Sequence, residues 1–310
     1  MKLLRTKFLY QEACRNSPDV HEITERERIE LQHRLLSIYR EIEAVCIRHN
    51  LTVMLAYGSV LGAIRHGGFI PWDDDMDLFM PRRDYELMIN QYADELPDYL
   101  KVYAPNSRNK AITRFAKVVD TRTKFIEAES DDLDDPSQGV FVDIFPLDSI
   151  GVNSFLNAVN RYISMFLMYM GSSVGYYEKN SVNYRKLMAY SFTTRFNYWF
   201  RYCLGFFGSF ISFQTWMNII DKFCKKNNRT GFLDELVGEY KWHPLPESIF
   251  LPPVRGKFEG INVFLPHDAK RHLEHSYHDW KRIPRKEERG QHFINCIKIN
   301  PENGVSITKD

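Results

Sequence analysis

The stretch from Leu55 to Pro81 constrains this chain more than any other, because it places glycines and a dense group of carboxylates close together. Four of the five residues from 73 to 77 are aspartates, and they run directly into the alternating apolar residues of DMDLFM. If that segment is a strand, Asp75 and Asp77 leave one face of it while the apolar residues face a core. Adjacent carboxylates repel one another unless a cation lies between them, and hard oxygen ligands suit Mg²⁺ or Mn²⁺. The pattern predicts a metal site on a sheet.

A second feature of this stretch is the pair Gly58 and Ser59, which follows the apolar run LTVMLAY and precedes VLGAIRH. We expect a strand over 51–57, then a turn, then a short helix capped by Ser59. Such a turn exposes backbone N–H groups, which attract phosphate oxygens. Gly-Ser turns and acidic loops are each common without a ligand. Together, a phosphate-binding turn and an Asp-x-Asp strand are typical of metal-assisted phosphoryl or nucleotidyl transfer.

A third carboxylate, Asp143, lies in GVFVDIFPLD, where its nearest neighbours are apolar. An aspartate in such a strand is costly unless it is paired, hydrogen-bonded or bound to metal. We therefore expect Asp143 to complete the cluster with Asp75 and Asp77, and to take the proton from an attacking hydroxyl. Asp148, at the end of the same segment, is interpreted as a cap.

Several basic side chains are candidates for contact with a donor or an acceptor molecule, and each also has a simpler structural interpretation. Arg65 lies between the glycine-serine pair and the aspartates, so it reaches either a phosphate, the acceptor or one of the carboxylates. Lys117, in the strand-like FAKVVD, either holds the donor's phosphates or lies on a sheet edge. Arg289 and His292 are interpreted as part of a solvated charged tail, with contact to donor or acceptor as the alternative.

The remaining periodic segments predict a scaffold around these residues. Residues 22–49 repeat apolar side chains in steps of four and three, which indicates one long helix with a single buried face. The segments ITRFAKVVD and TKFIE are rich in apolar and β-branched residues and predict strands.

Long parts of the chain resemble the LicD family. The resemblance is carried by GSVLGAIRHGGFIPWDDDMDLFMPRRDYE and continues at FAKVVDTRTKFIE, GVFVDIFPLD and KFEGINVFLPHDAKRHLEHSYHDWKRIP, so that it spans 30–150 and 255–292. Fukutin-type ribitol-phosphate transferases are more distant relatives with the same core. The last segment departs from the family pattern, because His278 stands where a Tyr-Gly-Asp has its glycine.

The resemblance implies an α/β (α+β) fold, in which a nucleotidyltransferase-like mixed sheet is flanked by helices and carries a mainly helical insertion. We expect a catalytic core at 22–150, an aromatic and basic insertion at 151–245, and a C-terminal block at 246–310 that packs back on the core. The resemblance also implies an enzyme, a LicD-type phosphotransferase. A hydroxyl of a cell-surface glycan, or of its lipid-linked precursor, would attack the β-phosphate of a CDP-linked alcohol such as CDP-choline.

In that reaction Mg²⁺ or Mn²⁺ held by Asp75, Asp77 and Asp143 would bridge the donor phosphates, with Gly58 and Ser59 binding them. Three alternatives stay open: a nucleotidyltransferase attacking the α-phosphate, a metal-dependent glycosyltransferase, and a non-catalytic protein that binds a nucleotide or glycan. The three acids argue against the last, since a binding protein would not need them. The sequence does not distinguish which phospho-group moves or which glycan accepts it.

Composition limits the partners and the setting. The net charge is +1 and no long basic run occurs, so nucleic acid is not an expected partner. Five cysteines lie far apart without zinc-like spacing, which indicates reduced thiols. The opening MKLLRTKFLYQEACR lacks the uninterrupted apolar region of a signal peptide. We therefore expect a cytoplasmic protein.

Residues 149–220 differ in character from the rest, with six Lys or Arg against one Glu among many aromatic residues. Tyr202 to Ile220 carries no charge, but its glycines and polar residues make it a poor membrane span. Besides a membrane span, residues 149–220 have two other interpretations. These residues form buried helices, or they form a peripheral surface that lies on anionic lipid at the inner face of a membrane.

Overall fold

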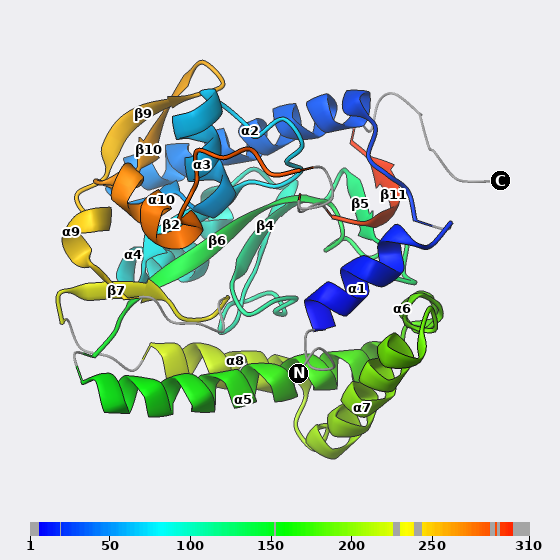
Figure 1. Ribbon diagram of the computed structural model, residues 1–310. Coiled ribbons are helices and arrows are strands. Elements are labelled where there is room, and N and C mark those ends of the chain that lie inside the picture. The colour runs from blue at the N-terminus through cyan, green and yellow to red at the C-terminus, as the bar shows by residue number, and fades with distance from the viewer. Residues whose placement is uncertain are drawn as a thin grey trace.

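The computed structural model describes residues 6–18, 20–151, 153–225, 230–238, 244–285, 289 and 292–299. They form a curled mixed sheet flanked by helices, with a further layer of helices beneath it (Figure 1). This confirms the predicted α/β fold with its mixed sheet and mainly helical insertion. The helices are α1 (Thr6–Arg15), α2 (Glu25–Arg48), α3 (Tyr57–His66), α4 (Arg82–Leu87), α5 (Ser154–Lys179), α6 (Val182–Met188), α7 (Phe192–Gly208), α8 (Phe213–Cys224), α9 (Glu247–Phe250) and α10 (Ala269–Tyr277). The strands are β1 (Met54–Leu55), β2 (Asp77–Pro81), β3 (Leu100–Tyr103), β4 (Ala116–Asp120), β5 (Lys124–Glu127), β6 (Val140–Ser149), β7 (Phe232–Glu235), β8 (Leu245–Pro246), β9 (Val254–Phe258), β10 (Ile261–Leu265) and β11 (Ile294–Lys298).

The main sheet has the strand order β1-β2-β6-β4-β3, with β7 paired to β6 and β8 paired to β7. β2 and β6 run parallel, whereas the other pairs of this sheet are antiparallel. All of β4 and nearly all of β6 are buried, as expected for strands covered on both faces. Two short antiparallel pairs, β9 with β10 and β5 with β11, lie outside this sheet. The strands predicted at FAKVVD, TKFIE and GVFVDIFPLD are confirmed.

The helix predicted for 22–49 is α2, and it covers one face of the sheet. A capping box starts it: the N–H of Glu27 donates to Thr24 Oγ1, and the N–H of Thr24 donates to the Glu27 carboxylate at 2.8 Å. The predicted apolar face is buried with side chains of β2, β4 and β6, and consists of Leu31, Leu35, Ile38, Ile42 and Val45.

The helical layer consists of α5, α7 and α8 packed on one another. α5 and α7 approach closely at Gly205, where a Cβ would lie 2.2 Å from the carbonyl oxygen of Ser173. Arg201 is buried between the same helices, donates to Ser173 Oγ at 2.6 Å, and lies 4.0 Å from the ring centroid of Tyr169. Its charge therefore belongs to the interior of the layer and not to a lipid-facing surface.

The uncharged run from Tyr202 to Ile220 is divided between α7 and α8. Within the described part of the chain, no helix taken alone has both the length and the apolar character needed to cross a membrane. α7 and α8 meet that criterion only when taken together, with a bend of 86° between them.

Arg82 connects the sheet to the helical layer. As the first residue of α4 it donates to both carboxylate oxygens of Asp148 at 2.7 Å and to Asp221 on α8 at 2.6 Å. All three side chains are largely buried. Asp148 is therefore one partner of a buried ion pair, and its interpretation as a cap is wrong.

Replacing Arg82 tests how much this connection stabilises the fold. Arg82→Ala leaves Asp148 and Asp221 buried without their counter-charge, so we expect the free energy of unfolding to fall by about 3–5 kcal/mol. Urea denaturation followed by circular dichroism measures the change. The matched control is Arg26→Ala, which removes an exposed pair with Glu30 on α2 and should cost no more than about 0.5 kcal/mol. Equal losses in the two variants would contradict this assignment.

Candidate functional site

Asp77 and Asp143 stand opposite one another on neighbouring parallel strands in the main sheet. β2 begins at Asp77, and its register partner on β6 is Asp143, so both side chains leave the same face. The contact extends one residue further, because the N–H of Asp143 donates to the carbonyl oxygen of Met76 at 3.1 Å. The pairing of two strands that are distant in sequence thus brings together two of the predicted carboxylates.

Asp75 lies just before β2, so the strand predicted at DMDLFM begins later than expected. The negative charge of Asp75 nevertheless raises the pKa of both Asp77 and Asp143. Burial raises the pKa of Asp77 well above its ordinary value, and the charges of Asp75 and Asp143 raise it further. Burial also raises the pKa of Asp143 to about 6, although Lys117 opposes the shift. Burial and the neighbouring acids therefore disfavour the ionised forms of Asp77 and Asp143.

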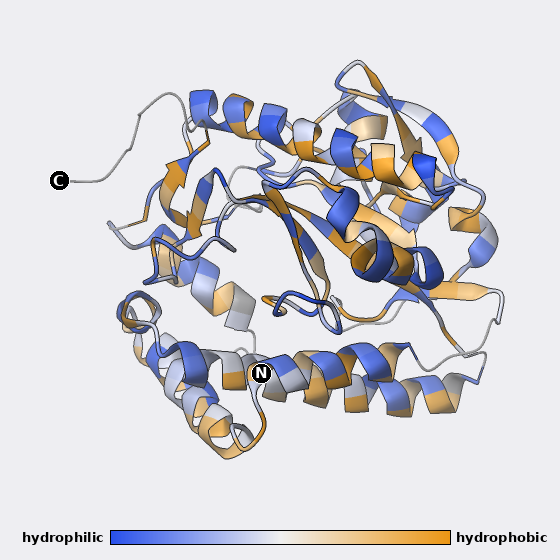
Figure 2. Cartoon of the chain, turned by 180° about the vertical axis from the view of Figure 1, so that it is seen from behind, coloured by the Kyte–Doolittle hydropathy of each residue, from blue (hydrophilic) through white to orange (hydrophobic). Residues whose placement is uncertain are grey.

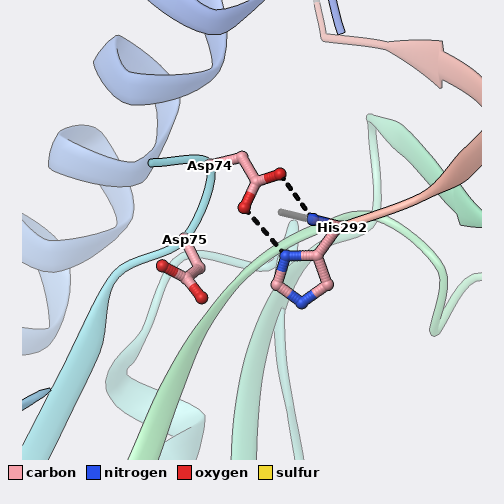
Figure 3. Close-up of side chains that lie close together, drawn as sticks. All are labelled: Asp74, Asp75 and His292. Carbon is pink, nitrogen blue, oxygen red and sulfur yellow. Dashed lines mark hydrogen bonds and ion pairs between the residues drawn. The ribbon is translucent and has the colours of Figure 1, made fainter. Parts of the chain in front are cut away.

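Asp74 binds His292, which lies just before β11 (Figure 3). The backbone N–H of His292 donates to Asp74 Oδ2 at 2.8 Å, and the ring Nδ1 lies 2.9 Å from Oδ1. Burial alone would lower the pKa of His292, but the contact with Asp74 raises it to about 10. In turn, His292 holds the pKa of Asp74 below its ordinary value despite burial. A charged imidazole thus offsets part of the negative charge of the cluster.

The interpretation of Arg289 and His292 as a solvated tail is wrong. His292 is bonded to Asp74, and the guanidinium of Arg289 lies 3.9 Å from the ring centroid of Trp72. Ligand atoms of Asp74, Asp75 and His292 all lie within 4.8 Å of one another, so these residues form a further group that could hold a metal ion. Asp74 belongs to the run of aspartates already evident in the sequence. Nothing in the local sequence near His292 indicates that the segment before β11 lies at this site.

Gly58 and Ser59 lie in the first turn of α3, and the predicted capping role of Ser59 is wrong. Ala56 occupies the N-cap position, and no side chain among the described residues caps the helix. Ser59 Oγ instead accepts the backbone N–H of Asp77 at 3.0 Å, which fixes the start of β2. A Cβ at Gly58 would lie only 3.1 Å from Oδ2 of Asp73, so a larger residue would crowd that carboxylate. Phosphate binding by the pair stays a prediction.

Tyr57 holds this turn in a strained conformation. Its φ of +40° lies in the left-handed region, which is unfavourable for a residue with a bulky side chain. The ring packs edge-on against Phe79 and Phe145, with centroid distances of 4.9 and 5.3 Å. The hydroxyl donates to Glu235 Oε2 on β7 at 2.9 Å. These contacts fix the backbone immediately before Gly58.

Lys117 lies beside Asp143 on the central strand β4. Because β4 is paired with both β6 and β3, the alternative that places Lys117 on a sheet edge is wrong. Its Nζ lies 3.4 Å from Asp143 Oδ1 and 3.2 Å from the ring centroid of Phe141. The ammonium group therefore lies where it would also meet a phosphate bound at the carboxylates, which stays a prediction.

Arg65 ties α3 to the segment that follows α10. Its Nη1 donates to the carbonyl oxygens of Trp280 at 2.8 Å and Arg282 at 3.2 Å. His278, which stands where the family pattern has glycine, adopts a φ of +51° and so takes the backbone conformation that glycine adopts most easily. A positive φ is therefore adopted at this position without the glycine.

A cavity of about 780 Å³ opens beside the aspartates. Its wall carries the positive charges of Arg65, Arg282 and Arg289, together with the ring of Trp72. The run Asp73–Asp75 forms another part of the wall, so cationic and anionic groups face the same space. A cavity of this size suits a small-molecule ligand.

The fold and site define an α/β protein with a carboxylate centre on a mixed sheet, placed beside a ligand-sized cavity. Residues 50–158 match the family model described as LicD/FKTN/FKRP, nucleotidyltransferase domain, and this segment contains Asp75, Asp77, Lys117 and Asp143. The chain is also similar to the lipopolysaccharide cholinephosphotransferase LicD of Haemophilus influenzae, with 24% identity over 269 residues, 84% of this chain and 93% of the relative. The resemblance to the LicD family is confirmed.

The pair formed by Asp74 and His292 predicts a pH-dependent contribution to stability. The pKa of His292 is raised from 6.5 to about 10, so its stabilisation is complete below pH 6.5 and is lost as the pH rises through 10. We expect the stability difference between the wild type and His292→Gln to be largest near pH 6 and to shrink towards pH 10. Thermal melts across that range measure it. His33→Gln, on the exposed side of α2, should have little effect, and a constant difference for His292→Gln would contradict the pairing.

Proposed function

We propose that this chain is a metal-dependent phosphotransferase that moves phosphocholine, or a related phospho-alcohol, from a CDP-linked donor to a hydroxyl of a cell-surface glycan or its lipid-linked precursor. The gathering of Asp75, Asp77 and Asp143 carries this proposal. The relative is a lipopolysaccharide cholinephosphotransferase, which supports phosphocholine as the group and lipopolysaccharide as the class of acceptor. Three arginines in the wall of the large cavity, Arg65, Arg282 and Arg289, support a donor that carries phosphates, although the same wall also carries the carboxylates of Asp73–Asp75.

The carboxylates fit Mg²⁺ or Mn²⁺. Asp143 Oδ1 is buried and has no hydrogen-bond donor among the described residues, with only the ammonium of Lys117 nearby at 3.4 Å. His292 is protonated at neutral pH and uses Nδ1 to bind Asp74, so it is a poor metal ligand. We place the hard cation at the all-oxygen set of Asp75, Asp77 and Asp143, although the ligand atoms of this set, unlike those of Asp74, Asp75 and His292, do not all lie within 4.8 Å of one another in the described part of the chain. When bound, the ion would offset charge on the phosphates during transfer.

The residues of the chain would supply the remaining chemistry. The acceptor hydroxyl forms a new bond to the β-phosphorus, the bond from that phosphorus to the bridging oxygen breaks, and CMP leaves. Asp143, with a pKa of about 6, is ionised at neutral pH and takes the hydroxyl proton. Lys117 offsets charge on the phosphate, and Arg65 and Arg289 hold the nucleotide side of the donor. Ser59 keeps Asp77 in place because its Oγ accepts a hydrogen bond from the backbone N–H of Asp77.

The products distinguish this reaction from its alternatives. A nucleotidyltransferase would release pyrophosphate after attack at the α-phosphate. A glycosyltransferase would move a sugar without its phosphate, and a binding protein would release nothing. The sheet and carboxylates are compatible with all of these, so the similarity to a cholinephosphotransferase is what favours release of CMP.

Replacing one carboxylate tests the proposal. We expect Asp77→Asn to lower CMP release from CDP-choline at least about 100-fold in the presence of Mg²⁺ and a lipopolysaccharide acceptor. Its stability without metal should not fall, because removing one acid relieves repulsion. Metal-dependent thermal stabilisation by CDP-choline should also be lost. Asp94→Asn, at an exposed ion pair, is the control. Undiminished turnover by Asp77→Asn would refute the site.

We further propose that the helical layer lies on an anionic lipid surface at the inner face of a membrane. Its outward residues recur at helical spacing and are each at least 40% exposed: Phe155, Leu156, Val159, Tyr162, Ile163 and Phe166 on α5, and Phe192, Phe196, Trp199, Phe200, Phe206 and Phe207 on α7. Hydrophobic residues run along the side of this layer that faces away from the sheet (Figure 2). The exposed bases nearby, which suit anionic lipid, are Lys179, Arg185, Lys186 and Arg195.

Vesicle binding tests this surface. The double variant Trp199→Ser with Phe207→Ser should weaken co-sedimentation with phosphatidylglycerol vesicles about tenfold, because it removes two exposed rings from the contact. Ile47→Ser should not change binding, because Ile47 is 56% exposed but belongs to α2, which lies across the sheet from the helical layer (Figure 1). Absence of vesicle binding by the wild type would exclude the lipid contact.

A further inference from the structure

A second cavity, of about 340 Å³, lies between strands β5 and β6 on one side and helices α5 and α6 on the other. The rings of Phe125 on β5 and Phe141 on β6 form one side of its wall, and those of Tyr176 on α5 and Tyr184 on α6 form another. The two tyrosines are stacked with a centroid distance of 4.8 Å, and the two phenylalanines meet edge-on at 5.9 Å. The cavity is therefore lined by aromatic rings from two parts of the chain, of which Tyr176 is stacked on Tyr184 and also lies 4.8 Å from the guanidinium of Arg201.

Carboxylates outnumber cations in the same wall. It contains five acidic side chains, Glu127, Glu129, Asp131, Asp132 and Asp135, against the two lysines Lys117 and Lys179. Asp131 is already used at the start of α6, where it accepts the N–H groups of Val182 and Asn183. Asp132 accepts the N–H of Asp134 and Asp135 accepts that of Ser137, which leaves Glu127 and Glu129 as the acids of this wall without such a contact to the described backbone.

The electrostatics of Glu129 agree with a missing positive charge. Burial raises the pKa of Glu129 to about 7, and the neighbouring Glu127 adds to the shift, although Lys179, a hydrogen bond from Tyr10 and the charge of His292 oppose it. Phe141 already contacts a cation, because Lys117 Nζ lies 3.2 Å from its ring centroid. A further cation beside Glu129 would lie near the aromatic rings and the carboxylates, with Lys117 and Lys179 in the same wall.

The second cavity adjoins the carboxylate centre. Glu127 lines both cavities, and Lys117 lines the second cavity while lying 3.4 Å from Asp143. A donor with its nucleotide in the large cavity and its phosphates near Lys117 would therefore reach the second cavity with its alcohol group. Aromatic faces with carboxylates are how proteins bind quaternary ammonium groups.

We propose that the cavity between Phe125, Phe141, Tyr176 and Tyr184 binds the quaternary ammonium group of the donor, with Glu129 as its counter-charge. This rests on the proposed function for the identity of the donor, and it goes beyond it by assigning the residues that choose the transferred group. Helices α5 and α6, which carry Tyr176 and Tyr184, thereby take part in donor selection. A neutral alcohol of the same shape would fill the space without using the charge or the ring faces.

The test compares a charged ligand with an uncharged one of equal shape, using the full chain. Choline and 3,3-dimethylbutanol are titrated by nuclear magnetic resonance, and turnover is measured with CDP-choline and with CDP-3,3-dimethylbutanol. We expect wild type to prefer the charged member of each pair. Glu129→Gln and Tyr176→Leu should each weaken choline binding and raise KM for CDP-choline about tenfold with kcat little changed. Tyr176→Phe, which keeps the ring, and Glu30→Gln on α2 are the controls.

The outcomes separate this site from the proposed function. Choline binding that depends on Glu129 and Tyr176 would support the site even if CDP-choline is not turned over, in which case the proposed donor is wrong. Turnover of CDP-choline with an unchanged preference in both variants would leave the function standing and overturn the site. A wild type that neither binds choline nor distinguishes the paired donors would overturn the site as well.

Discussion

The parallel pairing of β2 with β6 is the constraint on which the rest of this structure depends. It places Asp77 opposite Asp143 on one face of a sheet whose other neighbours are apolar. Two acids in that position are unfavourable by themselves, because burial and mutual repulsion both disfavour their ionised forms. The surrounding elements are arranged in ways that reduce this cost while leaving the carboxylates available.

Counter-charges reach the cluster from several parts of the chain. Lys117 comes from the adjacent strand β4, and His292 comes from the segment before β11. The two are not equivalent, because His292 is bonded to Asp74, whereas Lys117 lies directly beside Asp143. Arg82 pairs with two other buried acids, Asp148 on β6 and Asp221 on α8. Lys117 and His292 thus act on different members of the cluster, and the metal ion that we propose would act on Asp75, Asp77 and Asp143.

Local patterns predicted the parts of this structure that depend on short-range physics. The spacing of apolar residues located α2, the β-branched runs located β4 and β5, and a lone acid in an apolar run selected Asp143. The errors came from contacts that no local pattern encodes. Ser59 bonds to the backbone of β2 and does not cap its own helix, and Lys117 lies inside the sheet because β3 covers its strand. His292 reaches Asp74 only because β11 pairs with β5, which a single sequence does not reveal.

The bond between Asp74 and His292 joins residues 218 positions apart, and this separation bears on how the molecule folds. Helices α2 and α5 are held by neighbouring residues and form from local contacts, whereas the site needs the closure of a long loop and a parallel strand pair. We therefore expect the carboxylate centre to assemble among the late events of folding. Collapsed forms that precede it would contain most of the secondary structure while lacking a competent centre, so helix content by itself would overstate how much of a preparation is active.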